Sequence, residues 1–530
     1  MNKKRFFIGV LMLFLCCLVT GFSAFGQSNK KINTRAKLLE YDEELLPGAQ
    51  RLLGNVVFQH ENTIGYCDSA YYYENDNYLI AFGKPVRIYI GDSVQLYGKK
   101  VYYDGNARMA SIARDVKMVH DNARLYSDSL IYDLNEEVGY YVTGGVMINE
   151  DDTLKSQFGH FYTKTNDVIL DKNVRLNSPS YLMDCDSLKY NTAQEKVYFI
   201  SRTHLISDEN VIYTSSGWYE TKTDLATLTD DVEMYSGSQT PLADSVYYDK
   251  NLRYGIGWNN VMVSDSAKGY ILKGNYMEHH ELGGFSTAAD SNQLVLIDES
   301  RDSLYLHSDT LRILIDSVQE PQVMMAFNHV KFYRKDMQGV CDSLVYNVND
   351  STILMFHNPV LWSDENQLSA DTITFYLIDS THMEINLIKA GFIVSSMFDE
   401  TEFNQVKGNH ITGYVVNKQL TTVNVVNNAE CVYFIMDEDS TLIGVNTSAT
   451  SEMKVWWTDN QIDGTVCDND PDGKIYPDKD LPDKDRRLKD FRWLNFYRPE
   501  SIEDIYVRPI PRIKGSEQSV LPLLDTSPSE

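Results

Sequence analysis

Only a few short clusters in this sequence have residue types and spacing that could bind a metal ion. Residues 468–473 read DNDPDG and match the start of a calcium-binding loop, in which carboxylates at alternate positions supply the oxygen ligands. Lys479 stands where that loop requires a glutamate and Pro471 interrupts it, so an acidic turn is the better interpretation. Residues 279–281 (HHE) are adjacent, but neighbouring histidines on a strand point to opposite faces. The sequence therefore predicts no metal and no cofactor.

Catalytic motifs are absent from the sequence. There is no G-x-S-x-G, no Walker loop, no zinc-type cysteine pair and no H-E-x-x-H. We therefore predict that the protein is not an enzyme. Repeated Asp-Ser/Thr-apolar triplets match the O-glycosylation acceptor of some Gram-negative bacteria, although the simpler interpretation is that Asp and Ser begin a strand after a turn.

The composition favours a folded β-protein with no affinity for nucleic acid. The chain has 530 residues, with 48 Lys and Arg against 75 Asp and Glu, and a net charge of −27. Such an acidic chain lacks the basic stripes that nucleic-acid phosphates require. Apolar residues make up 43% of the chain, which is enough for a core, and the 35 tyrosines favour β-strands.

The N-terminus has the pattern of a secretory signal peptide. Residues 3–5 (KKR) form a basic region before the apolar residues 6–19, and residues 24–26 (AFG) form a small-x-small cleavage site. The apolar stretch is too short for a comfortable membrane span. We expect an exported protein; a retained anchor and a lipoprotein attached through Cys16 or Cys17 are the alternatives.

A valine-led tripeptide with apolar residues two positions apart recurs along most of the chain. Its first five copies start at residues 56, 86, 116, 146 and 174, in steps of 30, 30, 30 and 28 residues. A period held this closely is typical of a repeat architecture. The apolar outer positions and the variable middle position predict a strand with one buried face. The copies are Val56-Val57-Phe58, Val86-Arg87-Ile88, Val116-Lys117-Met118, Val146-Met147-Ile148, Val174-Arg175-Leu176, Val232-Glu233-Met234, Val261-Met262-Val263, Val330-Lys331-Phe332 and Val360-Leu361-Trp362.

A second element, Asp-Ser-apolar-x-Tyr, follows each of several tripeptides by roughly 12 residues. Examples are residues 128–132 (DSLIY) and 186–190 (DSLKY). Turns rich in Asn, Asp and Gly separate the elements. Each repeat thus contains about three short strands and no helix.

Strands this short cannot bury a face alone, so neighbouring copies must stack. The predicted fold is all-β: an elongated β-jellyroll or solenoid-like stack of roughly 30-residue repeats, with two facing sheets. The predicted organisation is a signal peptide (1–26), an N-terminal lead-in (27–50), a first repeat block (51–240), a second repeat block (241–457) and a polar C-terminal cap or tail (458–530).

Residues 54–58 (GNVVF), 67–72 (CDSAYY) and 81–86 (AFGKPV) are similar to a GNV start, an A-D-x-L-x-Y centre and an A-x-G-x-V return. Repeated in phase over about 400 residues, this pattern resembles the OstA/LptA family of lipopolysaccharide-transport proteins. The resemblance implies a β-jellyroll that is open at both ends, has an apolar interior, and carries lipid A acyl chains across the periplasm. This chain has more copies than the short periplasmic bridge protein and lacks the large C-terminal barrel of the outer-membrane member.

An apolar groove would suit such a cargo, because a lipid chain costs about 0.8 kcal/mol for each CH₂ exposed to water. The hypothesis is a non-enzymatic, periplasmic lipid-binding bridge or chaperone in lipopolysaccharide transport and outer-membrane assembly. That the same residues merely fill a closed core stays open as an alternative. The candidate groove residues are Val56, Phe58, Val86, Ile88, Val116, Met118, Leu130, Tyr132, Val146, Ile148, Val174, Leu176, Leu188, Tyr190, Val232 and Met234.

The expected partners are the acyl chains of lipopolysaccharide, other transport proteins joined by edge-strand addition, and further copies joined end to end. The expected location is the periplasm, free or associated with the outer membrane. The acidic charge favours binding to acyl chains over the anionic head. Two other functions remain: an exported β-helical carbohydrate-active enzyme, which would need an acidic cluster on one concave face, and an outer-membrane-associated structural scaffold.

Three of the cysteines, Cys67, Cys185 and Cys341, precede Asp-Ser at the same repeat position. Stacking would hold them farther apart than the roughly 7 Å that a disulfide spans, so we predict that they are unpaired. Cys431 and Cys467 are left as a pair that could form a bridge.

Arginines and aromatic residues cluster near the C-terminus. This composition is typical either of a partner interface or of a cap over the last open edge of the stack, and we prefer the cap. The residues are Arg486, Arg487, Phe491, Arg492, Trp493, Phe496, Tyr497 and Arg498.

Overall fold

The computed structural model describes residues 31–508 except 45–46, 208–209, 298–301, 380, 438–440, 459–460 and 470. The predicted signal peptide and the end of the tail lie outside the described residues. The chain forms two compact units, residues 1–203 and 204–530. In the described part of both units all regular structure is β-strand apart from four short 3₁₀ turns, so the predicted all-β fold is confirmed.

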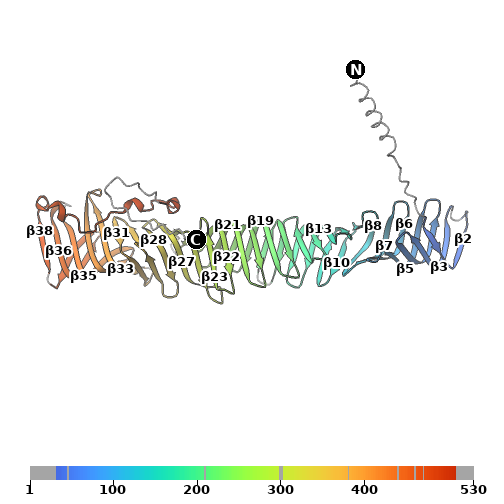
Figure 1. Ribbon diagram of the computed structural model, residues 1–530, viewed down its shortest axis with the longest axis horizontal. Helices are drawn as coiled ribbons and strands as arrows, with labels where there is room; N and C mark the ends of the chain where they lie inside the picture. Colours follow the sequence, from blue (N-terminus) through green and yellow to red (C-terminus); the bar gives the residue numbers. More distant parts are fainter. Residues whose placement is uncertain are drawn as a thin grey trace, which may run out of the picture. The chain divides into compact units, whose positions relative to one another are not determined.

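The strands of unit 1 are β1 (Asn33–Arg35), β2 (Leu38–Tyr41), β3 (Gln50–His60), β4 (Thr63–Tyr73), β5 (Tyr78–Ile90), β6 (Val94–Asp104), β7 (Met109–His120), β8 (Ala123–Asp133), β9 (Val138–Tyr141), β10 (Gly145–Asn149), β11 (Asp152–Ser156), β12 (Phe158–Tyr162), β13 (Asp167–Asn177), β14 (Leu182–Asn191) and β15 (Lys196–Phe199). The long strands β3 to β8 lie side by side in sequence order, whereas β9 pairs with β12 and β10 pairs with β8 (Figure 1).

Unit 2 continues the same pattern with longer strands towards the C-terminus. Its strands are β16 (Thr203–Ile206, whose first residue belongs to unit 1), β17 (Asn210–Thr214), β18 (Ser216–Glu220), β19 (Leu225–Ser236), β20 (Gln239–Asp249), β21 (Tyr254–Asp265), β22 (Tyr270–His280), β23 (Phe285–Ala289), β24 (Gln293–Ile297), β25 (Ser303–His307), β26 (Thr310–Ile315), β27 (Pro321–Arg334), β28 (Met337–Asn347), β29 (Thr352–Phe356), β30 (Val360–Ser363), β31 (Asn366–Ser369), β32 (Thr372–Leu377), β33 (His382–Met397), β34 (Glu402–Val416), β35 (Gln419–Met436), β36 (Leu442–Thr458), β37 (Gln461–Asp468) and β38 (Asp472–Tyr476). The division between repeat blocks predicted at residues 240 and 241 falls inside β20 and stays a prediction.

Each unit is an antiparallel meander whose long strands bend in the middle. In β3, residues 50–53 pair with the second half of β4, and residues 56–60 pair with its first half. The same arrangement recurs in β5, β7 and β13 and, in unit 2, in β19, β21, β27 and β33. The bends therefore fold each meander lengthwise into two sheets. The first halves of β3, β5, β7 and the other bent strands named above, with the strand segments paired to them, form layer 1. Their second halves, with the segments paired to those, form layer 2.

In each of these strands except β5, the bend is a corner made by two consecutive residues with left-handed backbone. In β3 these are Gly54 (φ 78°) and Asn55 (φ 49°). An ordinary residue pays about 1–2 kcal/mol for this conformation, whereas glycine, asparagine and aspartate adopt it more readily. The valine of the repeated tripeptide follows directly. The other corners of this kind are Arg114-Asp115, Lys172-Asn173, Asp230-Asp231, Asn259-Asn260, Asn328-His329, Lys389-Ala390 and Asn427-Asn428.

The Asp-Ser motif marks the opposite side of the same corner. Because Leu53 pairs with Ser69 and Val56 pairs with Cys67, the two corner residues of β3 oppose the single residue Asp68. Two residues against one is a β-bulge, which bends the strand. Asp128, Asp186, Asp244 and Asp342 occupy the same place opposite later corners. The valine-led tripeptide and the Asp-Ser motif therefore lie on two paired strands, on opposite sides of the same corner.

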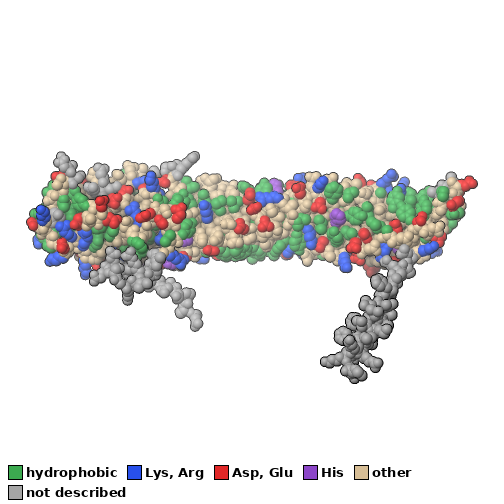
Figure 2. Space-filling view, turned by 90° about the horizontal axis from the view of Figure 1, so that it is seen from above, with side chains coloured by type: hydrophobic (Ala, Val, Ile, Leu, Met, Phe, Trp, Pro, Cys, Tyr) green, Lys and Arg blue, Asp and Glu red, His purple; other side chains and the backbone are tan. Residues whose placement is uncertain are grey.

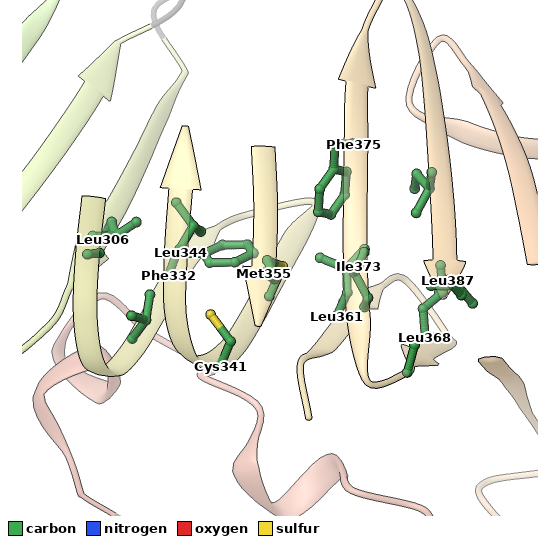
Figure 3. Packing of buried hydrophobic residues seen from close by; sticks show 14 of the residues in the cluster. Leu306, Phe332, Cys341, Leu344, Met355, Leu361, Leu368, Ile373, Phe375 and Leu387 are labelled. Atoms are coloured by element: carbon green, nitrogen blue, oxygen red, sulfur yellow. The ribbon is translucent and has the colours of Figure 1, made fainter. Parts of the chain in front are cut away.

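The core lies between the layers. Along each strand buried side chains alternate with exposed ones, as the period of two predicts. In unit 2, Leu306, Phe332 and Leu361 of layer 2 pack in one cluster with Met355 and Ile373 of layer 1. Figure 3 shows these side chains pointing towards one another. Each unit therefore has an apolar interior lined by both layers.

One of the tripeptides is displaced by one residue from the expected register. Tyr126 of β8 pairs with Lys117 on one side and with Val146 on the other, so Val146 takes the outward position of Lys117. Met147, not Val146 or Ile148, is buried. The prediction of Val146 and Ile148 as inward residues was wrong. Ser127 pairs with Val116 on one side and with Gly145 on the other, so the tripeptide begins one residue after the inward position, and a shift of one residue exchanges the faces of a strand.

The C-terminal residues 477–508, which we call the strap, form no strand. The strap contains η1 (Asp478–Asp480), η2 (Asp483–Asp485), η3 (Asn495–Tyr497) and η4 (Glu503–Tyr506), and it returns from β36 across the outer face of layer 2 to β27 and β25. Phe403 of this face packs against Phe491 and Trp493, with ring centroids 5.2 and 5.0 Å apart. The prediction that the arginine and aromatic cluster covers the last open edge was therefore wrong: it covers a sheet face.

Two glutamines on that face hold the strap with both polar atoms of their amides. Gln367 and Gln405 are fully buried, at 0% exposure. Each amide donates to one strap carbonyl and accepts from the strap N–H two residues further on. The bonds are Gln405 Nε2 to Arg486 O (2.8 Å), Leu488 N to Gln405 Oε1 (2.8 Å), Gln367 Nε2 to Arg492 O (2.8 Å) and Leu494 N to Gln367 Oε1 (2.6 Å).

The register at β10 predicts opposite outcomes for neighbouring substitutions. Met147→Asp places an unpaired carboxylate in the core, so we expect the free energy of unfolding to fall by about 3–5 kcal/mol. Val146→Asp points outward and should cost less than about 1 kcal/mol. Urea unfolding of both variants measures the difference. Equal costs would contradict the assigned register.

The hydrogen bonds from the two buried glutamines to the strap predict a local loss of stability when one glutamine side chain is removed. Gln367→Ala leaves the N–H of Leu494 and the carbonyl of Arg492 without their partner, which should cost about 2–3 kcal/mol and speed hydrogen exchange at the Leu494 amide. The exposed Gln419→Ala serves as the control and should change neither. An unchanged rate of hydrogen exchange at the Leu494 amide in the Gln367→Ala variant would show that Gln367 does not hold the strap.

Candidate functional site: an apolar interior with one latched side

The structure places most of the predicted groove residues in the interior. All of them are buried except Val146, Ile148 and Met234, which are partly exposed. They come from both layers: Leu130 and Leu188 stand after the corner aspartates in layer 1, whereas Val116 and Met118 follow a corner in layer 2. Their role as a lipid groove stays a prediction. Their burial, at 3% exposure or less, shows that the two layers touch.

The two long sides of this interior are built differently. On the corner side each bent strand passes unbroken from one layer to the other, and ladder hydrogen bonds continue on both sides of the bend. On the other side the layers end in hairpin turns, such as residues 61–62 in layer 2 and 105–108 in layer 1. In the described residues the layers are joined there through side chains and not through strand pairing. We call this the latched side.

We call each side-chain contact that joins the layers on this side a latch. In unit 1 one latch joins a hairpin of layer 1 to a hairpin of layer 2. The guanidinium of Arg108 in layer 1 lies 2.7 Å from the carboxylate of Glu61 in layer 2. Beside it, the hydroxyl of Tyr103 in layer 1 lies 2.8 Å from Nδ1 of His60 in layer 2. Burial raises the pKa of Tyr103 to about 12, so its phenol stays protonated at neutral pH.

Two further latches follow along unit 1. Nε2 of His120 in layer 2 lies 2.9 Å from Oδ1 of Asn166 in layer 1. Farther on, the hydroxyl of Tyr190 in layer 1 donates to Asp152 at 2.9 Å and accepts from Nδ2 of Asn149 at 3.0 Å, both in layer 2. Burial and the charge of Asp152 raise the pKa of Tyr190, which keeps the proton on the donor. The latched side is thus closed by separate polar contacts.

Unit 2 has ion pairs at the equivalent places. Lys418 of a layer 1 hairpin lies 3.4 Å from Asp336 and 3.8 Å from Asp302, both in layer 2 hairpins. Lys268 of layer 2 lies 2.5 Å from Glu320 of layer 1. These side chains are partly exposed, so each pair contributes at most about 1 kcal/mol.

Sequence reasoning missed the latch residues, although a signal for them exists. Along two of the layer 2 strands the third inward position is polar where the first two are apolar: His60 follows Val56 and Phe58, and His120 follows Val116 and Met118. A histidine or asparagine at an inward position next to a turn predicts a polar contact at the rim, because a buried polar group needs a partner.

Other candidate sites give no further chemistry in the described residues. The five cysteines there, including Cys431 and Cys467, are free, which confirms the prediction for Cys67, Cys185 and Cys341. No cluster of metal-ligating side chains occurs within residues 31–508 outside the gaps given above. The calcium-like loop includes residue 470, which lies outside the described residues. None of the helices described is long and apolar enough to span a membrane.

Two segments of the chain match known protein families. Residues 29–186 match the OstA-like protein family, and residues 297–381 match the family of LptA and LptD N-terminal-domain lipopolysaccharide-transport proteins. In these segments the chain belongs to the OstA/LptA-like family. The resemblance drawn from the sequence is confirmed, and the first segment contains the latches around Arg108 and His120.

Comparisons with individual proteins add little to this family assignment. No curated protein sequence matches this OstA/LptA-like chain significantly. Among solved structures, one match is LptH, the LptA-homologous periplasmic component of the lipopolysaccharide-transport device of Pseudomonas aeruginosa. It is 16% identical, the match covers 21% of this chain and 80% of LptH, and the TM-score is 0.19.

The Lys418 latch predicts a pH-dependent contribution to stability. Burial raises the pKa of Asp336, but Arg334 and Lys418 lower it more, so the net pKa lies below the usual 3.8. A lowered carboxyl pKa stabilises the fold above that usual value, and this stabilisation is lost as the pH falls through the lower, folded-state pKa. Lys418→Met should therefore be less stable than wild type at pH 7, by at most about 1 kcal/mol, with the difference vanishing in acid at a pH below the lowered pKa of Asp336.

Urea unfolding midpoints at the two pH values measure this difference, with Lys418→Arg as the charge-preserving control. A difference for Lys418→Met that persists unchanged in acid would show that the ion pair is not its cause.

Proposed function

We propose that this protein binds the acyl chains of lipopolysaccharide between its two layers and carries them through the periplasm without catalysing a reaction. The family assignment supports lipopolysaccharide transport as the process. The observation that supports lipid binding is the difference between the two long sides of the interior: one is continuous backbone, and the other is held by a few side-chain contacts.

The free energies involved are compatible with opening on the latched side. Each latch contributes about 1 kcal/mol, and none of them belongs to a strand ladder. An acyl chain of about a dozen CH₂ groups gains about 10 kcal/mol on leaving water. The apolar side chains that separate when the layers part regain contact with the chain that enters. Insertion therefore breaks weak polar contacts and keeps the interior apolar.

The partners proposed from the sequence fit the ends of the stack. β1 and β2 pair with the two halves of β3, and β37 and β38 pair with the two halves of β36. A further strand added to either edge would continue both layers, which is how another transport protein or a second copy could extend the apolar interior. We propose the periplasm as the location, where such a chain of proteins would act.

Site-specific photo-crosslinking in cells tests lipid binding. A photo-reactive residue at Leu130, which points into the interior, should crosslink to lipopolysaccharide. The same residue at Ile131, on the opposite face of the same strand, should give at least about tenfold less product. Labelled lipopolysaccharide recovered with the purified protein is the readout. Equal crosslinking from both positions, or crosslinking from Ile131 alone, would contradict binding between the layers.

A further inference from the structure

The outer face of layer 2 in unit 1 carries an ordered row of aromatic and basic residues. Strand register places one residue of the row on each successive strand, so that each lies beside the next. The row runs Tyr66 (β4), Arg87 (β5), Tyr97 (β6), Lys117 (β7), Tyr126 (β8), Val146 (β10), Lys155 (β11) and Arg175 (β13).

These side chains are exposed or partly exposed, and three of the four cations in the row have no ion pair among the described residues. Tyr66 and Tyr126 are 45% and 38% exposed. Lys117 lies between the rings of Tyr97 and Tyr126, 5.7 and 6.0 Å from their centroids. Among the described residues no carboxylate lies within ion-pair distance of Arg87, Lys117 or Lys155. At the end of the row Arg175 pairs with Asp184.

A second row lies next to the first, two residues nearer the latched side. It consists of Ile64, Tyr89, Gln95, Val119, Arg124, Ile148 and Thr153 on the same strands. Most of these side chains are partly exposed, and the rings of Tyr66 and Tyr89 meet edge to face with centroids 6.0 Å apart. The face therefore combines exposed aliphatic groups with tyrosines and cations.

The charge of this face is opposite to that of the whole chain. The two rows contain the cations Arg87, Lys117, Arg124, Lys155 and Arg175 and no acidic residue, whereas the chain has 75 acidic residues against 48 basic ones. Figure 2 shows one face of the molecule, on which acidic, basic and hydrophobic side chains are intermixed. A segregated cationic face on an acidic protein indicates an anionic partner, because repulsion elsewhere on the chain leaves this face as the place of contact.

We propose that this face docks on the surface of an anionic lipid bilayer. Tyrosines, partly exposed aliphatic side chains and unpaired lysines and arginines together suit the boundary between lipid headgroups and acyl chains, where the rings and aliphatic groups leave water and the cations meet phosphates. A soluble polysaccharide or an acidic protein would use the charges but gain little from Ile64, Val119 and Ile148. The face lies on the outside of layer 2, so docking leaves the interior free to bind cargo.

Co-sedimentation of the exported full chain with vesicles tests this proposal. The protein should bind vesicles of phosphatidylcholine mixed with phosphatidylglycerol, bind pure phosphatidylcholine vesicles much more weakly, and lose affinity as salt is raised. Reversing two charges with Arg87→Glu and Lys117→Glu should weaken binding to the mixed vesicles at least about tenfold. Tyr66→Ser with Tyr126→Ser should weaken it several-fold without changing the net charge.

The matched control reverses two cations on the outer face of layer 1. Lys100 and Lys189 also lie over tyrosine rings, 4.3 and 5.1 Å from their centroids, so Lys100→Glu with Lys189→Glu makes the same change in charge. These variants should bind the mixed vesicles like wild type. Thermal unfolding confirms that each variant is folded, and retained lipopolysaccharide crosslinking from Leu130 separates docking from cargo binding.

Three results would overturn the proposal. One is the absence of binding to the mixed vesicles, and another is an equal loss of binding in the control variant. The third is binding to a soluble acidic polysaccharide or an acidic protein through the same residues when vesicles are not bound.

Discussion

The left-handed corner that recurs in the middle of alternate long strands is the constraint on which the rest of the structure depends. It turns a simple meander into two layers that bury a common interior, and it sets where every later residue points. Because two corner residues oppose one aspartate across the strand pair, the valine that follows begins the inward face of layer 2 and the apolar residue after Asp-Ser begins that of layer 1. Backbone geometry at one place thus determines both faces of a whole repeat.

The same construction makes the two sides of the interior unequal. The corner side cannot part without breaking strands, whereas the latched side is held by contacts such as Arg108 with Glu61 and Tyr190 with Asp152. Carrying a lipid requires an interior that opens without unfolding. An interior with continuous strands on the corner side and separate polar contacts on the latched side meets this requirement. It also leaves the outer faces of both layers free for other uses. In unit 2 the outer face of layer 2 is covered by the strap, and in unit 1 it presents tyrosines and cations.

Much of the fold could be predicted from the sequence because its determinants are local. The period of about 30 residues, the alternation of two and the turn residues all act within a few positions, and they identified the strands, the buried faces and the family. The error at Val146 arises from pairing: Gly145, not Val146, pairs with Ser127 as Val116 does, and the tripeptide alone does not reveal this register. The latches and the strap depend on residues far apart in the chain, such as Gln367 with residues 492 and 494, and no short pattern encodes such contacts.

A distance measured across the latched side tests most directly whether the two layers part there when lipid binds. Spin labels at Asn62 and Ala107, which lie at exposed hairpin tips of layer 2 and layer 1, would report the separation of the layers beside the latch between Arg108 and Glu61. We expect the distance between the labels to increase when lipopolysaccharide binds and to return to its initial value when the lipid is removed. Lipopolysaccharide bound at full occupancy with no change in that distance would contradict this expectation.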